Sequence, residues 1–246
     1  MLLRNGEGAQ TKPTTATNCF HDRIVNIQDV TICQPDPHTI RKGYLSFIEN
    51  AQHFRELIAD LTISEDEVLV SFDVKSLFLS VPAEDALTAV KETIAQDNEF
   101  ETRNQISAET LIAMVRTCLS MTSFQFKNQH YELTDGLAMG SPPSAPLANI
   151  FTSRLEKTAL AEVDAEDRPK SWFRYVDDVF SIIRRGAVNS FLLRLNEQHP
   201  QIKFTVEFEK DDKLPFLELT VCRPADGHLD TDILSKTHVY RTLSPL

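Results

Sequence analysis

The chain has 246 residues, which is long enough for one large domain or two small ones with a substantial buried core. Its 41% hydrophobic and 25% charged residues are ordinary for a globular protein, and seven Gly and twelve Pro exclude a collagenous or low-complexity chain. The sequence contains no run of about 18 apolar residues and no apolar signal-peptide core near Met1, so we expect neither membrane spanning nor secretion.

The net charge of −11 disfavours a general phosphate-binding surface, because nucleic-acid-binding proteins usually present a basic face. Acidic clusters also serve divalent-metal chemistry, whereas the simpler interpretation is a solvated acidic surface. The four cysteines form no CxxC pair, which argues against a zinc site or a disulfide framework and favours a reducing intracellular compartment. They are Cys19, Cys33, Cys118 and Cys222.

The first predicted segment, residues 1–43, is a poorly structured arm, because turn-forming residues surround one short apolar run. Beyond it, apolar residues recur at helical spacing and predict a helix over 46–60 with Ser46 as its cap. A strand over 68–73 follows, because β-branched and aromatic residues alternate there up to Asp73.

The rest of the chain predicts further helices and strands in alternation. They are helices after Pro82 and after Ser107, a hairpin over 124–133, a helix through 148–155, strands over 172–176 and 179–183, a helix over 188–195 and a strand over 202–208. Only Asp177 and Asp178 separate the paired strands, which predicts a tight hairpin with two carboxylates at its tip. The order predicts an α+β domain with helices packed on one face of an antiparallel sheet.

Three carboxylates at strand ends are the first candidates for chemistry. If the strand that ends at Asp73 lies beside the hairpin, Asp73, Asp177 and Asp178 converge and can hold two divalent ions. Such ions activate a hydroxyl nucleophile and stabilise the charge on a leaving phosphate oxygen. Taken alone, an Asp-Asp dipeptide is more often a solvated turn.

Four segments, taken in their order along the chain, favour the functional interpretation of these acids over a solvated turn. They are SFDVKSLFLSVP (71–82), DGLAMGSPPSAPLANIF (135–151), WFRYVDDVFSI (172–182) and IKFTVEFEKDDKLPFLELTVCR (202–223). Together they resemble the palm of a reverse transcriptase, most closely that of Penelope-like retroelements. The resemblance covers residues 44–243 and implies a polymerase palm, from partial fingers to the primer-grip region, with fingers and thumb incomplete.

The resemblance implies a metal site at the predicted carboxylates. Asp73 and Asp177 match the two metal-binding acids, Asp178 matches the third acid, and the backbone carbonyl of Val74 is an extra ligand. The implied cofactor is a pair of Mg²⁺ ions, with Mn²⁺ as a substitute.

The same resemblance implies substrate contacts, each with a simpler alternative. Phe78 matches the aromatic residue that screens the sugar 2′-position, although its spacing fits a core aromatic equally well. Gly140 and Ser141 match a loop that approaches nucleotide and template, and otherwise form an ordinary helix-capping turn. Arg174 and Tyr175 belong to the RYVDD signature, where Arg174 either neutralises the acids or touches the primer.

The segment Leu214–Leu219 is similar to the primer-gripping hairpin of the family. The same residues would also fit an apolar strand of the core. Lys210 and Lys213 are candidate phosphate contacts or part of a solvated charged turn. The chain departs from the family at Leu133, where the family usually has Gln, and at Glu218, where it has Asp. The first departure falls in the nucleotide and template region and could weaken binding there.

The implied function is that of an RNA-directed DNA polymerase fragment of a retrotransposon, which adds deoxynucleotides to a primer 3′-hydroxyl. Its implied partners are an RNA template, a DNA primer and deoxynucleoside triphosphates, with no membrane, and we expect nuclear residence. The alternative is a catalytically inactive remnant that binds RNA or a protein. A palm-type nucleotidyl cyclase shares the two-metal chemistry, but the sequence lacks its glycine-rich acidic signature.

Overall fold

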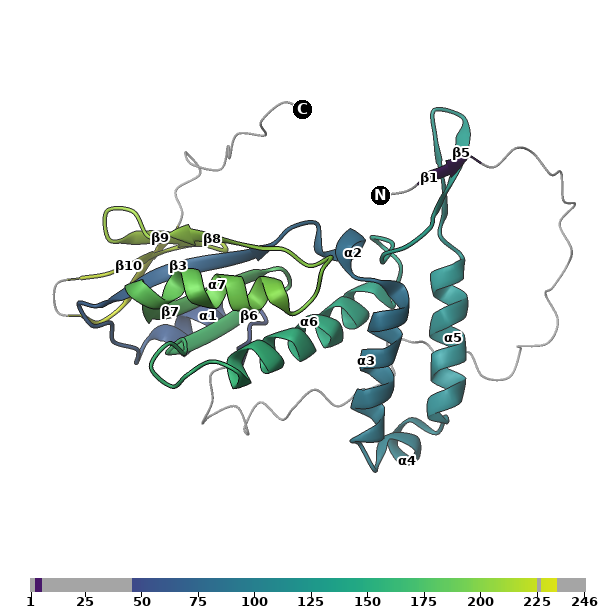
Figure 1. The fold of residues 1–246 in the computed structure, drawn as a ribbon, viewed down its shortest axis with the longest axis horizontal. Helices are drawn as coiled ribbons and strands as arrows, with labels where there is room; N and C mark the ends of the chain where they lie inside the picture. The colour runs from purple at the N-terminus through teal and green to yellow at the C-terminus, as the bar shows by residue number, and fades with distance from the viewer. Residues whose placement is uncertain (1–2, 6–45, 225–226, 234–246) are drawn as a thin grey trace, which may run out of the picture. The chain divides into compact units, whose positions relative to one another are not determined.

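The computed structural model describes residues 3–5, 46–224 and 227–233 (Figure 1). The predicted arm over 1–43 lies outside the described residues except for residues 3–5. The part of the family resemblance beyond residue 233 lies outside them as well. The chain divides into two compact units. Unit 1 contains Ser76–Leu155 together with the N-terminal strand, and unit 2 contains residues 46–75 and the described residues after Leu155.

Unit 2 is built on a five-stranded sheet with the order β2-β6-β7-β3-β8. The strands are β2 (Ser46–Phe47), β6 (Ser171–Tyr175), β7 (Asp178–Arg184), β3 (Glu67–Val74) and β8 (Phe204–Phe208). All neighbours are antiparallel except β2, which runs parallel to β6. The predicted strands and the antiparallel sheet are therefore confirmed, with β3 as the central strand that pairs on both sides.

One face of this sheet packs against helix α7 (Val188–Glu197), which follows the 3-10 turn η3 (Arg185–Ala187). Successive strand side chains point to opposite faces, so Phe72 of β3 and Trp172 of β6 lie on the same face. Their rings lie 5.9 Å and 5.3 Å from the ring of Phe191 on α7, measured between centroids. These aromatic contacts fix the helix to the sheet.

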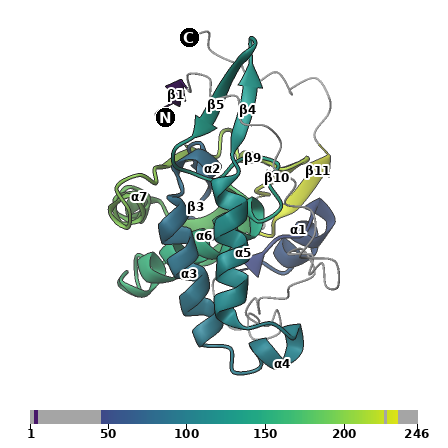
Figure 2. The same ribbon diagram turned by 90° about the vertical axis from the view of Figure 1, so that its right-hand side faces the viewer.

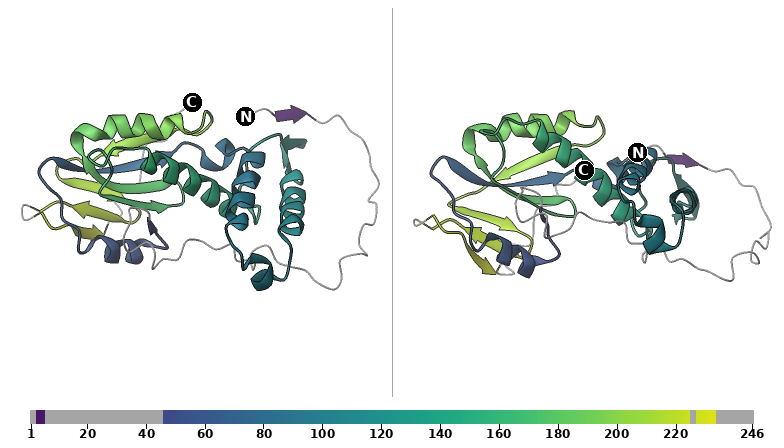
Figure 3. Two further views of the ribbon diagram at one scale, coloured as in Figure 1. Left: turned by 60° about the horizontal axis from the view of Figure 1, so that its bottom comes forward. Right: turned by 90° about the horizontal axis from the view of Figure 1, so that it is seen from below.

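The opposite face packs against a second layer (Figure 3), of which the sequence predicted the helix and the segment Leu214–Leu219 but not the three-stranded sheet. This layer contains α1 (Ala51–Ile58) and a three-stranded sheet of β9 (Lys213–Phe216), β10 (Leu219–Cys222) and β11 (Asp230–Ile233). Phe54 of α1 is fully buried, and its ring centroid lies 5.0 Å from that of Phe180 and 4.7 Å from that of Phe216. The core of unit 2 therefore extends over both faces of the sheet.

The predicted helix over 46–60 is wrong at its first residues, since Ser46 and Phe47 pair with β6 as a strand. The helix starts at Ala51, because the Asn50 side chain accepts a hydrogen bond of 2.9 Å from the backbone N–H of His53. A capping side chain of this kind satisfies an N–H group that has no partner in the first helical turn. The apolar spacing continued across this cap and concealed the strand.

Unit 1 contains the remaining helices and a hairpin (Figure 2). They are α2 (Leu77–Ser80), α3 (Ala83–Ala95), α4 (Phe100–Asn104), α5 (Ala108–Ser120), β4 (Ser123–Phe126), β5 (Gln129–Leu133) and β1 (Leu3–Asn5), which pairs with β5. Helix α6 (Ser144–Ala161) begins in unit 1 and ends in unit 2. The helices after Pro82 and Ser107 and the hairpin are confirmed.

The expectations about membrane spanning and about the cysteines can be compared with the described residues only. None of the helices in this part of the chain is both long and apolar enough to cross a bilayer. The two cysteines it contains, Cys118 and Cys222, are free thiols, and burial together with the neighbouring Asp232 carboxylate raises the pKa of the Cys222 thiol.

The aromatic cluster around Phe54 is expected to dominate the stability of unit 2. Replacing Phe54 with Ala should lower the free energy of unfolding by about 3–5 kcal/mol, because it removes buried ring contacts and leaves a cavity. Urea denaturation followed by the fluorescence of Trp172, the single tryptophan, measures this change. The control Leu193→Ala alters a side chain that is 65% exposed and should change stability by less than about 0.5 kcal/mol. Equal effects of the two variants would contradict the assigned core.

Candidate functional site

The register of the central sheet places two acidic residues directly opposite each other. Asp73 on β3 pairs with Asp178 on β7, and Thr205 on β8 pairs with Asp73 from the other side. Directly opposed residues have Cα atoms about 4.5–5.5 Å apart, with their side chains on the same face. Like charges at such positions repel each other, and a cation bound between them would offset that repulsion.

Asp177 lies in the turn next to this pair. The predicted hairpin is confirmed, but the prediction of two carboxylates at its tip is wrong, because Tyr175 pairs with Asp178 and leaves Val176 and Asp177 as the turn. The backbone carbonyl of Asp177 accepts a hydrogen bond of 3.3 Å from the N–H of Val74. The turn is therefore attached to the end of β3, and Asp73, Asp177 and Asp178 lie on adjoining parts of one sheet end.

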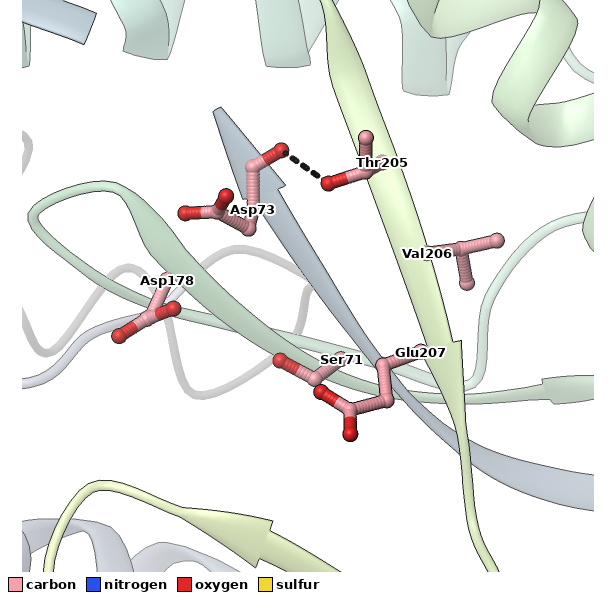
Figure 4. A pocket seen from close by; sticks show the side chains of 6 residues that line it. All are labelled: Ser71, Asp73, Asp178, Thr205, Val206 and Glu207. Carbon is pink, nitrogen blue, oxygen red and sulfur yellow. Dashed lines mark hydrogen bonds between the residues drawn. The ribbon is translucent and has the colours of Figure 1, made fainter. Parts of the chain in front are cut away.

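A pocket of about 280 Å³ opens over the acidic pair (Figure 4). Beyond Asp73 and Asp178, its lining includes Ser71, Thr205 and Glu207. The Thr205 hydroxyl donates a hydrogen bond of 3.3 Å to the backbone carbonyl of Asp73. Glu207 lies opposite Ser71, so its carboxylate belongs to the same face as Asp73.

Sequence reasoning missed Thr205 and Glu207 as pocket residues. They belong to the strand predicted over 202–208, where strict alternation did indicate that the two residues share a face. Alternation does not reveal which neighbour a strand pairs with or in which register. Their contribution to the pocket depends on the pairing of β8 with β3, which is a tertiary property.

Arg174 pairs with Val179, the residue after Asp178, and paired residues share a face. Because successive residues of a strand point to alternate faces, Arg174 lies on the face of the sheet away from the acidic pair. Its side chain is only 3% exposed, and its Nε donates a hydrogen bond of 2.9 Å to Oε2 of Glu156, which is fully buried. Its Nη1 also donates to the carbonyl of Val176 at 3.2 Å. The guanidinium therefore connects α6 to the turn that carries Asp177.

Tyr175 lies at the end of β6, opposite Asp178, and is 36% exposed. Because opposed residues share a face, its ring lies on the same face as the acidic pair. Tyr175 thus shares a face with the acidic pair, although it does not line the pocket.

The other predicted substrate residues, Phe78, Gly140 and Ser141, belong to unit 1. The side chain of Phe78 is half-buried on α2, and its carbonyl accepts a hydrogen bond of 2.7 Å from the N–H of Leu137. Gly140 has φ +90°, a backbone conformation that favours glycine. Ser141 accepts a hydrogen bond through its carbonyl from the N–H of Ser144, at the start of α6.

The loop between β5 and α6 also contains Gly136, a glycine that the sequence analysis did not single out. Gly136 has φ +97°, and a Cβ atom there would lie 2.9 Å from the carbonyl oxygen of Leu79. The loop can therefore approach α2 only because residue 136 has no side chain. By contrast, a Cβ at Gly140 would meet no atom within 4 Å, so only its backbone conformation favours glycine.

The donor chemistry of the acidic pair fits a hard divalent cation. Mg²⁺ prefers oxygen ligands and is usually held by one or two carboxylates, with water and substrate phosphates completing its shell. Asp73 and Asp178 provide such a pair, and Asp177 adjoins it. Within the described residues no three or more His, Cys, Asp or Glu side chains are already gathered as a ligand cluster.

No protein-family model and no curated protein sequence matches the chain. Solved structures do match. Apo telomerase from Candida tropicalis superposes with a TM-score of 0.61 at 13% identity, over 81% of this chain and 39% of the telomerase chain. Telomerase from Candida albicans in complex with a TWJ fragment of telomeric RNA has a TM-score of 0.59 at 11% identity, over 74% of this chain and 35% of that chain.

A viral enzyme is similar as well. The BmCPV RNA-dependent RNA polymerase in its quiescent state has a TM-score of 0.50 at 10% identity, over 76% of this chain and 18% of that chain. At such identities the similarity establishes the fold alone. The chain has a polymerase palm-like fold of mixed α and β structure with antiparallel sheets, and it spans well under half the length of these similar proteins.

The buried ion pair of Arg174 and Glu156 yields a stability prediction. Glu156→Leu should lower the free energy of unfolding by about 3–5 kcal/mol, because it leaves a buried guanidinium without its carboxylate. Adding Arg174→Met should recover part of this loss, since an apolar pair needs no desolvation of charge. Urea denaturation reports both values. Glu162→Leu removes the partner of an exposed pair with Arg194 and should cost at most about 1 kcal/mol; a similar cost for Glu156→Leu would contradict a structural ion pair.

The opposed acids yield a prediction about divalent ions. In EDTA, Asp178→Asn should raise the free energy of unfolding by about 0.2–1 kcal/mol, because it relieves the repulsion from Asp73. Adding Mg²⁺ should then stabilise the unsubstituted protein more than the variant, since a cation held between Asp73 and Asp178 loses one of its two carboxylate ligands in the variant.

Asp212→Asn is the matched control, because it removes one negative charge from an exposed position outside the pocket. It should respond to Mg²⁺ as the unsubstituted protein does. An equal response of all three proteins would show that Asp178 does not contribute to a cation site.

Proposed function

We propose that the chain is the palm region of a reverse transcriptase of the Penelope-like retroelement type, an RNA-directed DNA polymerase. One observation carries the proposal: a palm-like sheet presents Asp73 opposite Asp178, with Asp177 in the adjoining turn. These are the positions at which the sequence resembles the metal-binding acids of that family. The palm-like fold supports polymerase chemistry, and the residues of the four segments support the retroelement context.

In this proposal Asp73 and Asp177 bind two Mg²⁺ ions, for which Mn²⁺ substitutes, with Asp178 and the carbonyl of Val74 beside them. When bound, these ions activate the primer 3′-hydroxyl and stabilise the charge that develops on the departing phosphate oxygen. The protein itself contributes geometry. The pairing of β3 with β7 fixes the spacing of Asp73 and Asp178, and Arg174 holds the turn through the carbonyl of Val176.

The proposed nucleotide contacts come from several segments. Tyr175 lies on the face of the acidic pair, where an exposed ring can contact primer or nucleotide. Phe78 has a half-buried side chain, so part of its ring is available to screen the sugar 2′-position. Gly140 and Ser141 shape the turn before α6, where a bare backbone can approach a base pair. Arg174 acts as a positioning residue in this scheme.

The proposed template is RNA, and the proposed primer and substrates are DNA and deoxynucleoside triphosphates. The similar Candida albicans telomerase was solved with a fragment of telomeric RNA, which supports RNA as a ligand of this fold. A retrotransposon enzyme of this kind must reach chromosomal DNA, so we place it in the nucleus.

Primer extension tests the proposal. The chain should extend oligo(dT) on poly(rA) with Mg²⁺ or Mn²⁺, and Asp73→Asn or Asp177→Asn should each reduce the rate by at least about 100-fold. A loss of this size is expected because metal-ion catalysis contributes several kcal/mol of transition-state stabilisation. Asp212→Asn, which changes an exposed acid outside the pocket, should retain the rate of the unsubstituted chain.

The outcome also separates the proposal from its alternative. Extension that survives both the Asp73 and the Asp177 substitution would assign the activity elsewhere. No extension by a chain that unfolds cooperatively and binds primer–template would instead favour a catalytically inactive remnant that binds RNA.

A further inference from the structure

The β4–β5 hairpin of unit 1 exposes aromatic side chains that no core requires. Phe124 is 42% exposed and Phe126 is 57% exposed. They are two residues apart on β4, so both point to the same face, and Tyr131 on β5 is directly opposite Phe124. One face of the hairpin is therefore aromatic, while the other carries Gln125 opposite His130.

The aromatic side chains form an organised surface. The rings of Phe124 and Tyr131 stack with an interplanar angle of 20° and a centroid separation of 5.5 Å. The ammonium group of Lys127 lies 5.4 Å from the centroid of the Phe126 ring. Flat rings beside a cation match the two parts of a nucleotide, its base and its phosphate.

The charge of this face differs from that of the whole chain, which carries a net charge of −11. Residues 123–133 contain one carboxylate, Glu132, and its pairing with Ser123 places it on the face away from the rings. The aromatic face thus presents Lys127 and the neutral Gln129 without a carboxylate from either strand. It suits an anionic ligand with stacking groups better than an acidic surface would.

The hairpin fixes the backbone positions from which these rings project. Its turn consists of Lys127 and Asn128, with φ of 49° and 60°, a conformation that matches the twist of two-residue hairpins. The ladder continues from Phe126 opposite Gln129 to Ser123 opposite Glu132. A rigid platform loses little conformational entropy when a ligand binds.

We propose that this aromatic face binds single-stranded polynucleotide, with bases stacked on Phe124, Phe126 and Tyr131 and a phosphate paired with Lys127. Base stacking accepts any sequence, which a polymerase template contact requires. The assignment of this strand as template rests on the proposed function, whereas the binding itself does not. The site consists entirely of residues 124–131 and shares no residue with the acidic pocket of unit 2.

Fluorescence anisotropy with labelled oligo(rU) tests the proposal on the full chain. The double variant Phe124→Ala/Phe126→Ala should weaken binding by at least about tenfold, because stacking contributes about 1–3 kcal/mol per base. Gln125→Ala, between the two on the opposite face, is the matched control and should change the affinity less than twofold. Both rings are exposed, so circular dichroism should show that all variants remain folded.

One further ligand and one further variant separate stacking from charge. An abasic oligomer of equal length should bind as weakly to the unsubstituted chain as oligo(rU) binds to the double variant. Lys127→Gln should weaken binding and flatten its dependence on salt, because one phosphate contact is lost.

Binding is measured in EDTA, so failure of primer extension and failure of this proposal remain distinguishable. No binding of oligo(rU), or equal affinities of the double variant and the unsubstituted chain, would overturn the proposal. Self-association that the double variant abolishes, without any effect on oligonucleotide binding, would identify the face as a contact between copies of the chain.

Discussion

The pairing of β3 with β7 is the constraint on which the described site depends. It sets Asp73 opposite Asp178, and a shift by one residue would move one of the two acids to the other face of the sheet. Apolar residues farther along the same strands resist such a shift, since Leu69 and Phe180 pack into the second layer while Phe72 packs against α7. The stable part of the sheet thus imposes a repulsive arrangement on its polar end. The positions of these two acids are therefore set by the packing of the sheet.

The turn at the end of β6 is supported from the side away from the acids. Arg174 spans from the buried Glu156 to the carbonyl of Val176, and Val176 adopts φ 55°, which is unusual for a β-branched residue. Such a conformation persists only where the surroundings hold it. A buried guanidinium is costly to desolvate, so its place behind the turn is best understood as support for the position of Asp177 rather than as a gain in stability.

Much of unit 2 was predictable because its strands have clear patterns. Val68, Val70 and Phe72 alternate with Ser71 and Asp73, and the hairpin over 172–183 has only two residues for its turn. The acids were therefore found from sequence, and the palm assignment followed from the order of four segments. The start of α1 was missed, because apolar spacing continues through Phe47 although Asn50 caps the helix later. The roles of Thr205 and Glu207 in the pocket could not be predicted, since strand register is decided by long-range packing.

The central position of β3 also has a consequence for how the chain acquires its structure. Both neighbours of this strand, β7 and β8, come roughly 100 residues or more later in the sequence, so no local contact can complete the sheet. During synthesis the apolar segment Val68–Phe72 emerges long before its partners exist. We therefore expect slow folding and a period in which this unpaired strand favours aggregation, which makes chaperone assistance more important for this chain than for a helical protein of equal length.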